Sequence, residues 1–100
     1  MDKLGIVLAT YNEALNLPPL IESLQGLDLP ETESHIFVVD DNSPDGTSQV
    51  AETLASRFGN ISVITRHGKG GLGSAVLVGM ESALAQGCTH VMTMDADLSH

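Results

Sequence analysis

The sequence predicts an α/β fold with a mostly parallel sheet, because short apolar runs alternate with helical patterns along the whole chain. The runs at 4–9, 36–39, 61–65 and 91–94 have the length of buried strands and are rich in apolar or β-branched residues. Three segments between them carry apolar residues at one-face helical spacing. Right-handed crossovers and short connections then predict the strand order 3-2-1-4.

The predicted helices begin and end at residues that favour helix boundaries. We expect Asn16 to cap the first helix and Gly26 to end it, while Gly59 ends the second. In the third helix, Gly79 predicts a close contact between helix and sheet. The residues expected to face the sheet from this third helix are Leu72, Ala75, Val76, Gly79, Met80, Ala83 and Leu84.

Length and composition predict one small domain over residues 1–100, since 100 residues with 42% hydrophobic content fit a single modest core. Thirteen acidic residues against four basic ones give a formal charge of -9, which argues against nucleic acid or an anionic membrane as partner. The single cysteine, Cys88, and the lack of a signal sequence at the start predict a cytoplasmic setting. Membrane contact is expected only through regions outside this sequence.

A pair of carboxylates, Asp95 and Asp97, follows the last apolar run. Mg²⁺ and Mn²⁺ prefer oxygen ligands and leave coordination positions open for substrate phosphates. The spacing therefore predicts a divalent metal site that serves diphosphate chemistry.

Three polar clusters follow predicted strands, namely 10–13, Asp40-Asp41 and 95–97. Ligands of open parallel sheets bind beyond the carboxyl ends of the strands, near the point where the strand order reverses. The topology therefore predicts that the three clusters converge on one ligand site.

Several of these residues have a second, structural interpretation. Asp45 fits a carboxylate at the start of the second helix, and Glu13 fits an acid in the first turn of the first helix. Of Asp40 and Asp41, one is expected to face the crevice and the other to hold a loop, with Asp41 favoured as the ligand contact. Tyr11, the only tyrosine, is either half-buried or packs on a nucleobase.

The Gly-rich segment 68–73 opens the third predicted helix. It is no P-loop, because Gly70 follows Lys69 where that motif needs Ser or Thr. Lys69, with Arg66 and His67, supplies local positive charge, and we expect Lys69 to assist a phosphate.

Four segments together resemble glycosyltransferase family 2, and more narrowly the dolichol-phosphate or polyprenol-phosphate mannosyltransferases. They cover the chain in the family's order and are Ala9-Thr10-Tyr11-Asn12-Glu13, Val38-Val39-Asp40-Asp41-Asn42-Ser43-Pro44-Asp45-Gly46-Thr47, Gly68-Lys69-Gly70-Gly71-Leu72-Gly73-Ser74-Ala75 and Met94-Asp95-Ala96-Asp97-Leu98-Ser99-His100.

This resemblance implies a GT-A type, Rossmann-like three-layer sandwich, here ending just after the Asp-x-Asp motif, with GDP-mannose as donor and Mg²⁺ or Mn²⁺ as cofactor. Ala9 departs from the family, which usually has proline there. By position, the residues that contact the nucleotide would be Ala9, Tyr11, Glu13, Val39 and Asp41. Those that hold the metal and diphosphate would be Asp95, Ala96 and Asp97. The two aspartates would be the metal ligands and would carry the catalysis.

The family resemblance also implies that a dolichyl or polyprenyl phosphate accepts the mannose with inversion. Since the family's domain continues past this motif, we expect these 100 residues to bind the donor and not to transfer sugar unaided. Two alternatives stay open: a donor such as UDP-glucose, and a non-catalytic nucleotide-binding or assembly module. The second would form homo-oligomers through apolar surface left on the fourth or first strand.

Overall fold

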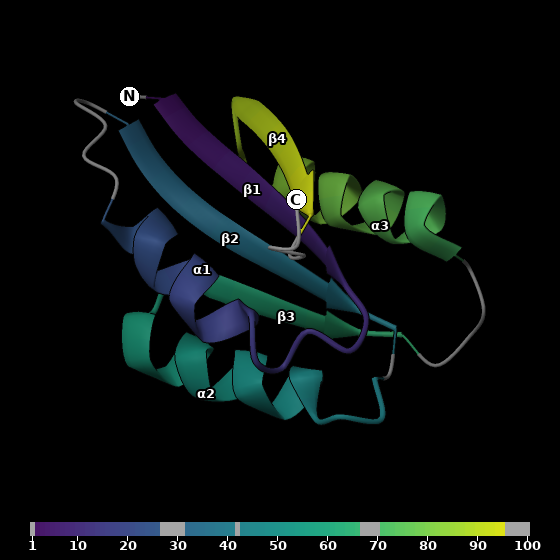
Figure 1. Ribbon diagram of the computed structural model, residues 1–100. Coiled ribbons are helices and arrows are strands. Elements are labelled where there is room, and N and C mark those ends of the chain that lie inside the picture. The colour runs from purple at the N-terminus through teal and green to yellow at the C-terminus, as the bar shows by residue number, and fades with distance from the viewer. Residues whose placement is uncertain (1, 27–31, 42, 67–70, 96–100) are drawn as a thin grey trace.

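The computed structural model describes residues 2–26, 32–41, 43–66 and 71–95. In this part of the chain four strands form one parallel sheet in the order β3-β2-β1-β4, which confirms the predicted order. Helices connect the strands, as Figure 1 shows. The elements are β1 (Asp2–Thr10), α1 (Leu17–Gln25), β2 (Thr32–Asp40), α2 (Thr47–Phe58), β3 (Ile61–Thr65), α3 (Gly71–Ala85) and β4 (His90–Asp95).

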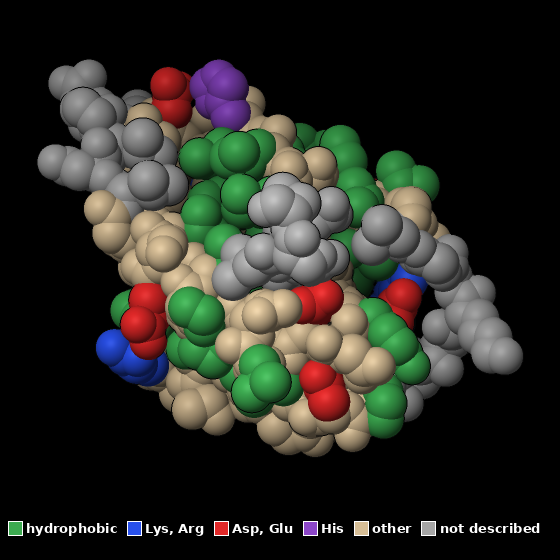
Figure 2. All heavy atoms as spheres, in the orientation of Figure 1, with side chains coloured by type: hydrophobic (Ala, Val, Ile, Leu, Met, Phe, Trp, Pro, Cys, Tyr) green, Lys and Arg blue, Asp and Glu red, His purple; other side chains and the backbone are tan. Residues whose placement is uncertain are grey.

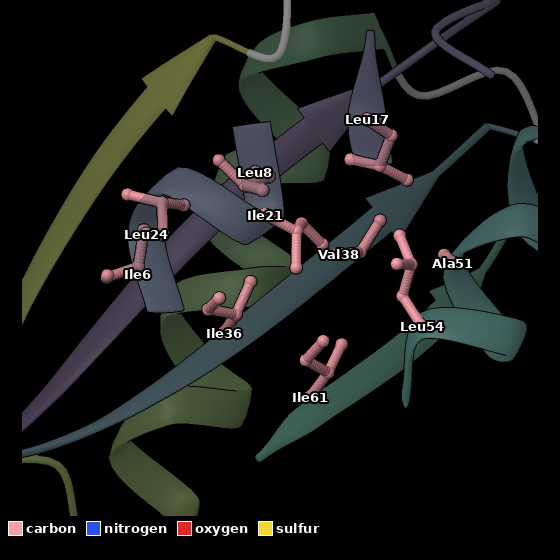
Figure 3. Packing of buried hydrophobic residues seen from close by; sticks show 10 residues of the cluster. All are labelled: Ile6, Leu8, Leu17, Ile21, Leu24, Ile36, Val38, Ala51, Leu54 and Ile61. Carbon is pink, nitrogen blue, oxygen red and sulfur yellow. The ribbon is translucent and has the colours of Figure 1, made fainter. Parts of the chain in front are cut away.

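The sheet is covered on both faces, so the expected three-layer arrangement is confirmed. Side chains alternate between the faces along each strand. In β1, Ile6 and Leu8 pack with α1 and α2, whereas Val7 and Ala9 pack with α3. Figure 3 shows the larger cluster, in which Leu17, Ile21, Leu24, Ala51 and Leu54 of the helices meet Ile6, Leu8, Ile36, Val38 and Ile61 of the sheet.

Helix α3 approaches the sheet closely at Gly79, as predicted. A Cβ atom at this position would lie 2.3 Å from Cγ1 of Val7 and 3.2 Å from Cγ2 of Val39. Both valines are fully buried, so they have little room to move. The small residues Ala75 and Ala83 lie on the same side of the helix.

The predicted inward face of α3 is wrong at two positions. Met80 is 36% exposed and Leu84 is 64% exposed, although both were expected to face the sheet. The small residues Ala75, Gly79 and Ala83 meet the strands most closely, and Val76 and Val78 pack beside them, so Met80 and Leu84 lie outside the contact. The side chain of Leu72 lies outside the described residues.

Replacing Gly79 with alanine should lower the free energy of unfolding by about 1–3 kcal/mol, because the added methyl group overlaps a buried valine. Urea unfolding followed by circular dichroism measures the change. Gly73→Ala is the matched control on the same helix, since a Cβ there has nothing within 4 Å. Equal stability of the two variants would contradict the close contact.

The ends of the first two helices follow the predicted residues but differ in detail. Asn16 occupies the N-cap position of α1, yet its side chain makes no capping bond and donates from Nδ2 to Oε2 of Glu13 (2.9 Å). Gly26 ends α1 with φ -79°, so glycine is not required there. Gly59 ends α2 with φ 79°, a left-handed conformation that favours glycine.

The expected apolar surface lies on β4 and not on β1. β1 is an interior strand between β2 and β4, and its residues 5–10 are buried. On β4, Met92 is 43% exposed. Figure 2 shows apolar side chains gathered over the region where Figure 1 shows β4 and the neighbouring part of β1. None of the helices in the described ranges is long and apolar enough to cross a membrane.

Candidate functional site

The carboxyl ends of β1, β2 and β4 lie side by side at one edge of the sheet (Figure 1). The register pairs Ala9 with Val39 on one side and with Asp95 on the other. The strand ends that lead into the three polar clusters therefore converge, as the topology predicted. Ala96, Asp97, Lys69 and the side chain of Asp95 lie outside the described residues.

Asp40 is the buried member of its pair and holds the loop that follows β2. Its side chain is fully buried, and its carboxylate accepts hydrogen bonds from the hydroxyl of Thr10 (2.8 Å) and from the backbone amide of Ser43 (2.9 Å). The hydroxyls of Ser43 (2.6 Å) and Ser48 (3.0 Å) donate to the same carboxylate. Asp40 is thus the aspartate that ties down the loop.

Asp41 lies at the rim of the site and pairs with Arg66. Oδ1 of Asp41 is 2.7 Å from both Nε and Nη2 of Arg66, and the two side chains are 22% and 15% exposed. Nη1 of Arg66 also donates to Oγ of Ser74 on α3 (2.8 Å). Sequence reasoning noted Arg66 only as local positive charge, and no short-range pattern links two residues 25 positions apart.

The loop after β1 presents Tyr11 to solvent. Tyr11 is 56% exposed, so the half-buried interpretation does not hold and its ring is accessible to a ligand. Asn12 adopts φ 57°, a left-handed conformation that is uncommon outside glycine and best tolerated by asparagine and aspartate. The loop therefore holds a specific, unusual backbone shape next to the exposed aromatic ring.

Glu13 does not lie in the first turn of α1, because that helix begins at Leu17. The helix-dipole interpretation of Glu13 is therefore wrong. Its carboxylate accepts a hydrogen bond from Asn16, and its backbone oxygen accepts from the amides of Asn16 (3.1 Å) and Leu17 (2.9 Å). Glu13 closes the turn that leads from the exposed loop into α1.

Asp45 serves the start of α2, as its structural interpretation predicted. Oδ1 accepts from the amide of Thr47 (3.1 Å) and from the Thr47 hydroxyl, and Oδ2 accepts from the amide of Ala14 (3.1 Å). Gly46, with φ 85°, occupies the N-cap position itself. The hydrogen bond from the Thr47 side chain is the largest cause that lowers the pKa of Asp45, partly offset by desolvation.

Acid titration should reveal these bonds. Because the pKa of folded Asp45 is depressed, its contribution to stability is complete above the pKa of the unfolded chain and is lost as the pH falls through the folded-state value. We expect the midpoint of the Asp45 carboxyl to lie below its model-peptide value, with the amide resonances of Ala14 and Thr47 shifting together at that pH. NMR titration measures this, and Asp45→Asn should abolish the shared midpoint. A midpoint at or above the model-peptide value would contradict the hydrogen-bonded geometry.

The donor chemistry at this edge fits a hard divalent cation. β4 ends at Asp95, a residue type whose carboxylate oxygens suit Mg²⁺ or Mn²⁺, and substrate phosphates commonly complete the coordination of these ions. Within the described ranges no three His, Cys, Asp or Glu side chains form a metal-binding group. A metal site here therefore depends on Asp95 together with Asp97, and Asp97 lies outside the described residues.

Comparison with known proteins matches residues 5–100 to the family model "Glycosyl transferase family 2". The polyprenol monophosphomannose synthase of Mycolicibacterium smegmatis is 41% identical over 96 residues, which are 95% of this chain and 35% of that protein. The dolichol-phosphate mannosyltransferase of Saccharomyces cerevisiae is 37% identical over 98 residues, 96% of this chain and 36% of that protein. The chain thus spans about a third of the length of these curated relatives.

Solved structures share the fold. TarS from S. aureus, in complex with UDP-GlcNAc, superposes with a TM-score of 0.80 at 31% identity over 95% of this chain and 26% of that chain. The mannosyltransferase PcManGT from Pyrobaculum calidifontis, in complex with GDP-Man and Mn²⁺, gives 0.74 at 22% identity over 94% and 27%, a likeness of fold alone. These likenesses confirm the expected GT-A type fold. Because the family model covers residues 5–100, the chain belongs to glycosyl transferase family 2.

Proposed function

We propose that this chain is the donor-binding part of a mannosyltransferase that transfers mannose from GDP-mannose to a polyprenyl or dolichyl phosphate. The observation that carries the proposal is the convergence of the Tyr11 loop, Asp41 and Asp95 at one edge of the sheet. Identities of 37–41% to polyprenol, undecaprenyl and dolichol phosphate mannosyltransferases support the choice of sugar and acceptor.

In this proposal the nucleotide lies across the carboxyl ends of β1 and β2. The exposed ring of Tyr11 packs on the base, and Asp41, held by Arg66, accepts hydrogen bonds from the nucleoside. Ala9 and Val39 are buried, so they contribute backbone atoms and shape. Glu13 adds a carboxylate at the rim.

The diphosphate lies toward the end of β4, with Asp95, Ala96 and Asp97. Asp95 and Asp97 would hold Mg²⁺ or Mn²⁺, which stabilises the charge on the departing nucleoside diphosphate. Lys69 assists the phosphates as a point charge. The acceptor's phosphate oxygen is largely ionised near neutral pH and attacks the anomeric carbon with inversion, so a dedicated general base is not required.

The whole protein's acceptor site would lie in sequence beyond these 100 residues, so we expect this chain to bind donor and not to transfer mannose by itself. We place the whole protein at the cytoplasmic face of a membrane, with contact through those other regions. Incubation of this chain with GDP-mannose and a short polyprenyl phosphate should give no product above background. Metal-dependent transfer by this chain alone would contradict the assignment of a separate acceptor part.

A UDP-sugar donor is the second candidate, because TarS in complex with UDP-GlcNAc is 31% identical and shares the fold. A competition assay distinguishes GDP-mannose from a UDP-sugar as the donor. In a displacement assay with a fluorescent GDP derivative, GDP-mannose should compete at least about tenfold better than UDP-GlcNAc, a difference of about 1.4 kcal/mol. The reverse order would replace GDP-mannose with a UDP-sugar and leave the position of the donor site unchanged.

An assembly role has one observation in its favour, namely the exposed Met92 on β4. Among the described strands β4 is an edge strand that pairs with β1, and edge strands can pair with a second copy. Light scattering measures the mass directly. A concentration-independent dimer that binds no nucleotide would favour this role over donor binding.

A further inference from the structure

Three consecutive backbone amides just after Tyr11 donate hydrogen bonds to side chains that lie 31 to 34 residues further along the chain. The acceptors all belong to the segment between β2 and the first residue of α2. These bonds join N of Asn12 to Oγ of Ser43 (2.9 Å), N of Glu13 to Oγ1 of Thr47 (2.9 Å) and N of Ala14 to Oδ2 of Asp45 (3.1 Å). We call these three side chains the loop anchors.

Carboxylates orient the two hydroxyl anchors so that they accept. The hydroxyl of Ser43 donates its proton to Oδ1 of Asp40, and the hydroxyl of Thr47 donates to Oδ1 of Asp45. Each hydroxyl has one proton and two lone pairs, so donation to a carboxylate leaves the lone pairs for a backbone amide. The buried Asp40 thereby fixes the loop after β1 through Ser43, without touching that amide itself.

The anchored segment is on the surface, so the anchors determine the shape of a loop more than the packing of the core. Tyr11 is 56% exposed, Asn12 is exposed, and Asn12 has the left-handed φ of 57°. A loop with little apolar burial relies on such polar contacts to remain in one uncommon conformation.

We propose that Ser43, Asp45 and Thr47 are positioning residues that hold residues 11–14 in the conformation that presents Tyr11 and Glu13 to the nucleotide. The inference rests on the proposed function, since the ligand it invokes is a guanosine diphosphate. On this view the segment after Asp41 acts on donor binding through the neighbouring loop. Its three anchors lower the entropy that the loop would otherwise lose when the donor binds.

Amide exchange tests the anchors without any ligand. Thr47→Val keeps the branched shape and removes the hydroxyl, so the amide of Glu13 should exchange at least about fivefold faster, as expected for one lost hydrogen bond. Thr47→Ser keeps the hydroxyl and should restore protection. Thr53→Val is the matched control, because the Thr53 hydroxyl donates to the backbone oxygen of Gln49 on the exposed side of the same helix.

Asp45→Ala tests the third anchor. Asp45 is exposed, so the variant should keep the fold while the amide of Ala14 exchanges faster.

Tyrosine fluorescence gives a second readout of the same loop, since the chain has one tyrosine and no tryptophan. Thr47→Val and Asp45→Ala should lower the fluorescence anisotropy of Tyr11 and should weaken GDP binding at least about fivefold, while Thr47→Ser and Thr53→Val match the wild type. If the amides of Glu13 and Ala14 exchange in these variants as they do in the wild type, the proposal that the loop anchors hold residues 11–14 is overturned. Faster exchange with unchanged GDP affinity would overturn their role in donor binding. If the wild type binds no GDP, the proposed function fails together with that role, and amide exchange alone decides whether the anchors hold the loop.

Discussion

Asp40→Ala should lower the free energy of unfolding by about 3–5 kcal/mol, because it removes a fully buried carboxylate that accepts several hydrogen bonds at once and leaves the Ser43 amide without its acceptor. The hydroxyls of Thr10 and Ser48 and the amide of Ser43 all donate to this carboxylate. Such a loss is a large part of the total stability of a 100-residue domain. Urea unfolding measures it.

Two further variants distinguish the loss of hydrogen bonds to the buried Asp40 carboxylate from the general effect of removing a negative charge. Glu52→Ala removes an acidic side chain from the exposed side of α2 and should change stability by less than about 0.5 kcal/mol. Asp40→Asn keeps one acceptor oxygen and should fall between the wild type and Asp40→Ala. A loss below about 1 kcal/mol for Asp40→Ala would contradict the structural role of the network.

Arg66→Ala should weaken GDP binding at least about tenfold, because Asp41 loses the guanidinium that fixes its carboxylate. Stability should fall as well, since both groups are partly desolvated and the variant leaves Asp41 unpaired. Arg66→Lys keeps the positive charge but lacks the planar guanidinium. Relative to Arg66→Ala, it should restore most of the stability but little of the affinity for GDP.

Arg57→Ala is the matched control for this change. Arg57 pairs with Glu22 at 3.1 Å, but both side chains are more than half exposed, at 60% and 51%. Such a surface pair contributes little, and the guanidinium also lies 4.7 Å from the centroid of the Phe58 ring, so stability should fall by no more than about 1 kcal/mol and affinity should not change. Calorimetric titration with GDP compares the variants, and equal affinity of Arg66→Ala and wild type would exclude Asp41 as an oriented ligand contact.

The topology and the position of the candidate site follow from local sequence patterns. Continuous apolar runs such as 36–39 indicate strands that are covered on both faces, and chirality rules then give the strand order. The polar residues after these runs must meet at one edge, whatever their individual roles. For this reason the convergence of Ala9, Val39 and Asp95 was predictable without any coordinates.

Contacts between distant residues were not predictable in the same way. The helical period of α3 predicts that Met80 and Leu84 face the sheet, but the contact is centred on Ala75, Gly79 and Ala83, and both residues are exposed. The pairing of Asp41 with Arg66 and of Thr47 with the amide of Glu13 depends on how two loops meet in space. The periodic patterns of the sequence carry no information about such contacts between loops.

The most direct test of the donor site is calorimetric titration of this 100-residue chain with GDP-mannose, with and without Mn²⁺, beside the variant Asp97→Ala. The proposed function predicts binding that requires Mn²⁺ and is lost in Asp97→Ala, while circular dichroism shows both proteins folded. Absence of heat from the folded wild type, with Mn²⁺ present, would contradict a donor and metal site in this chain.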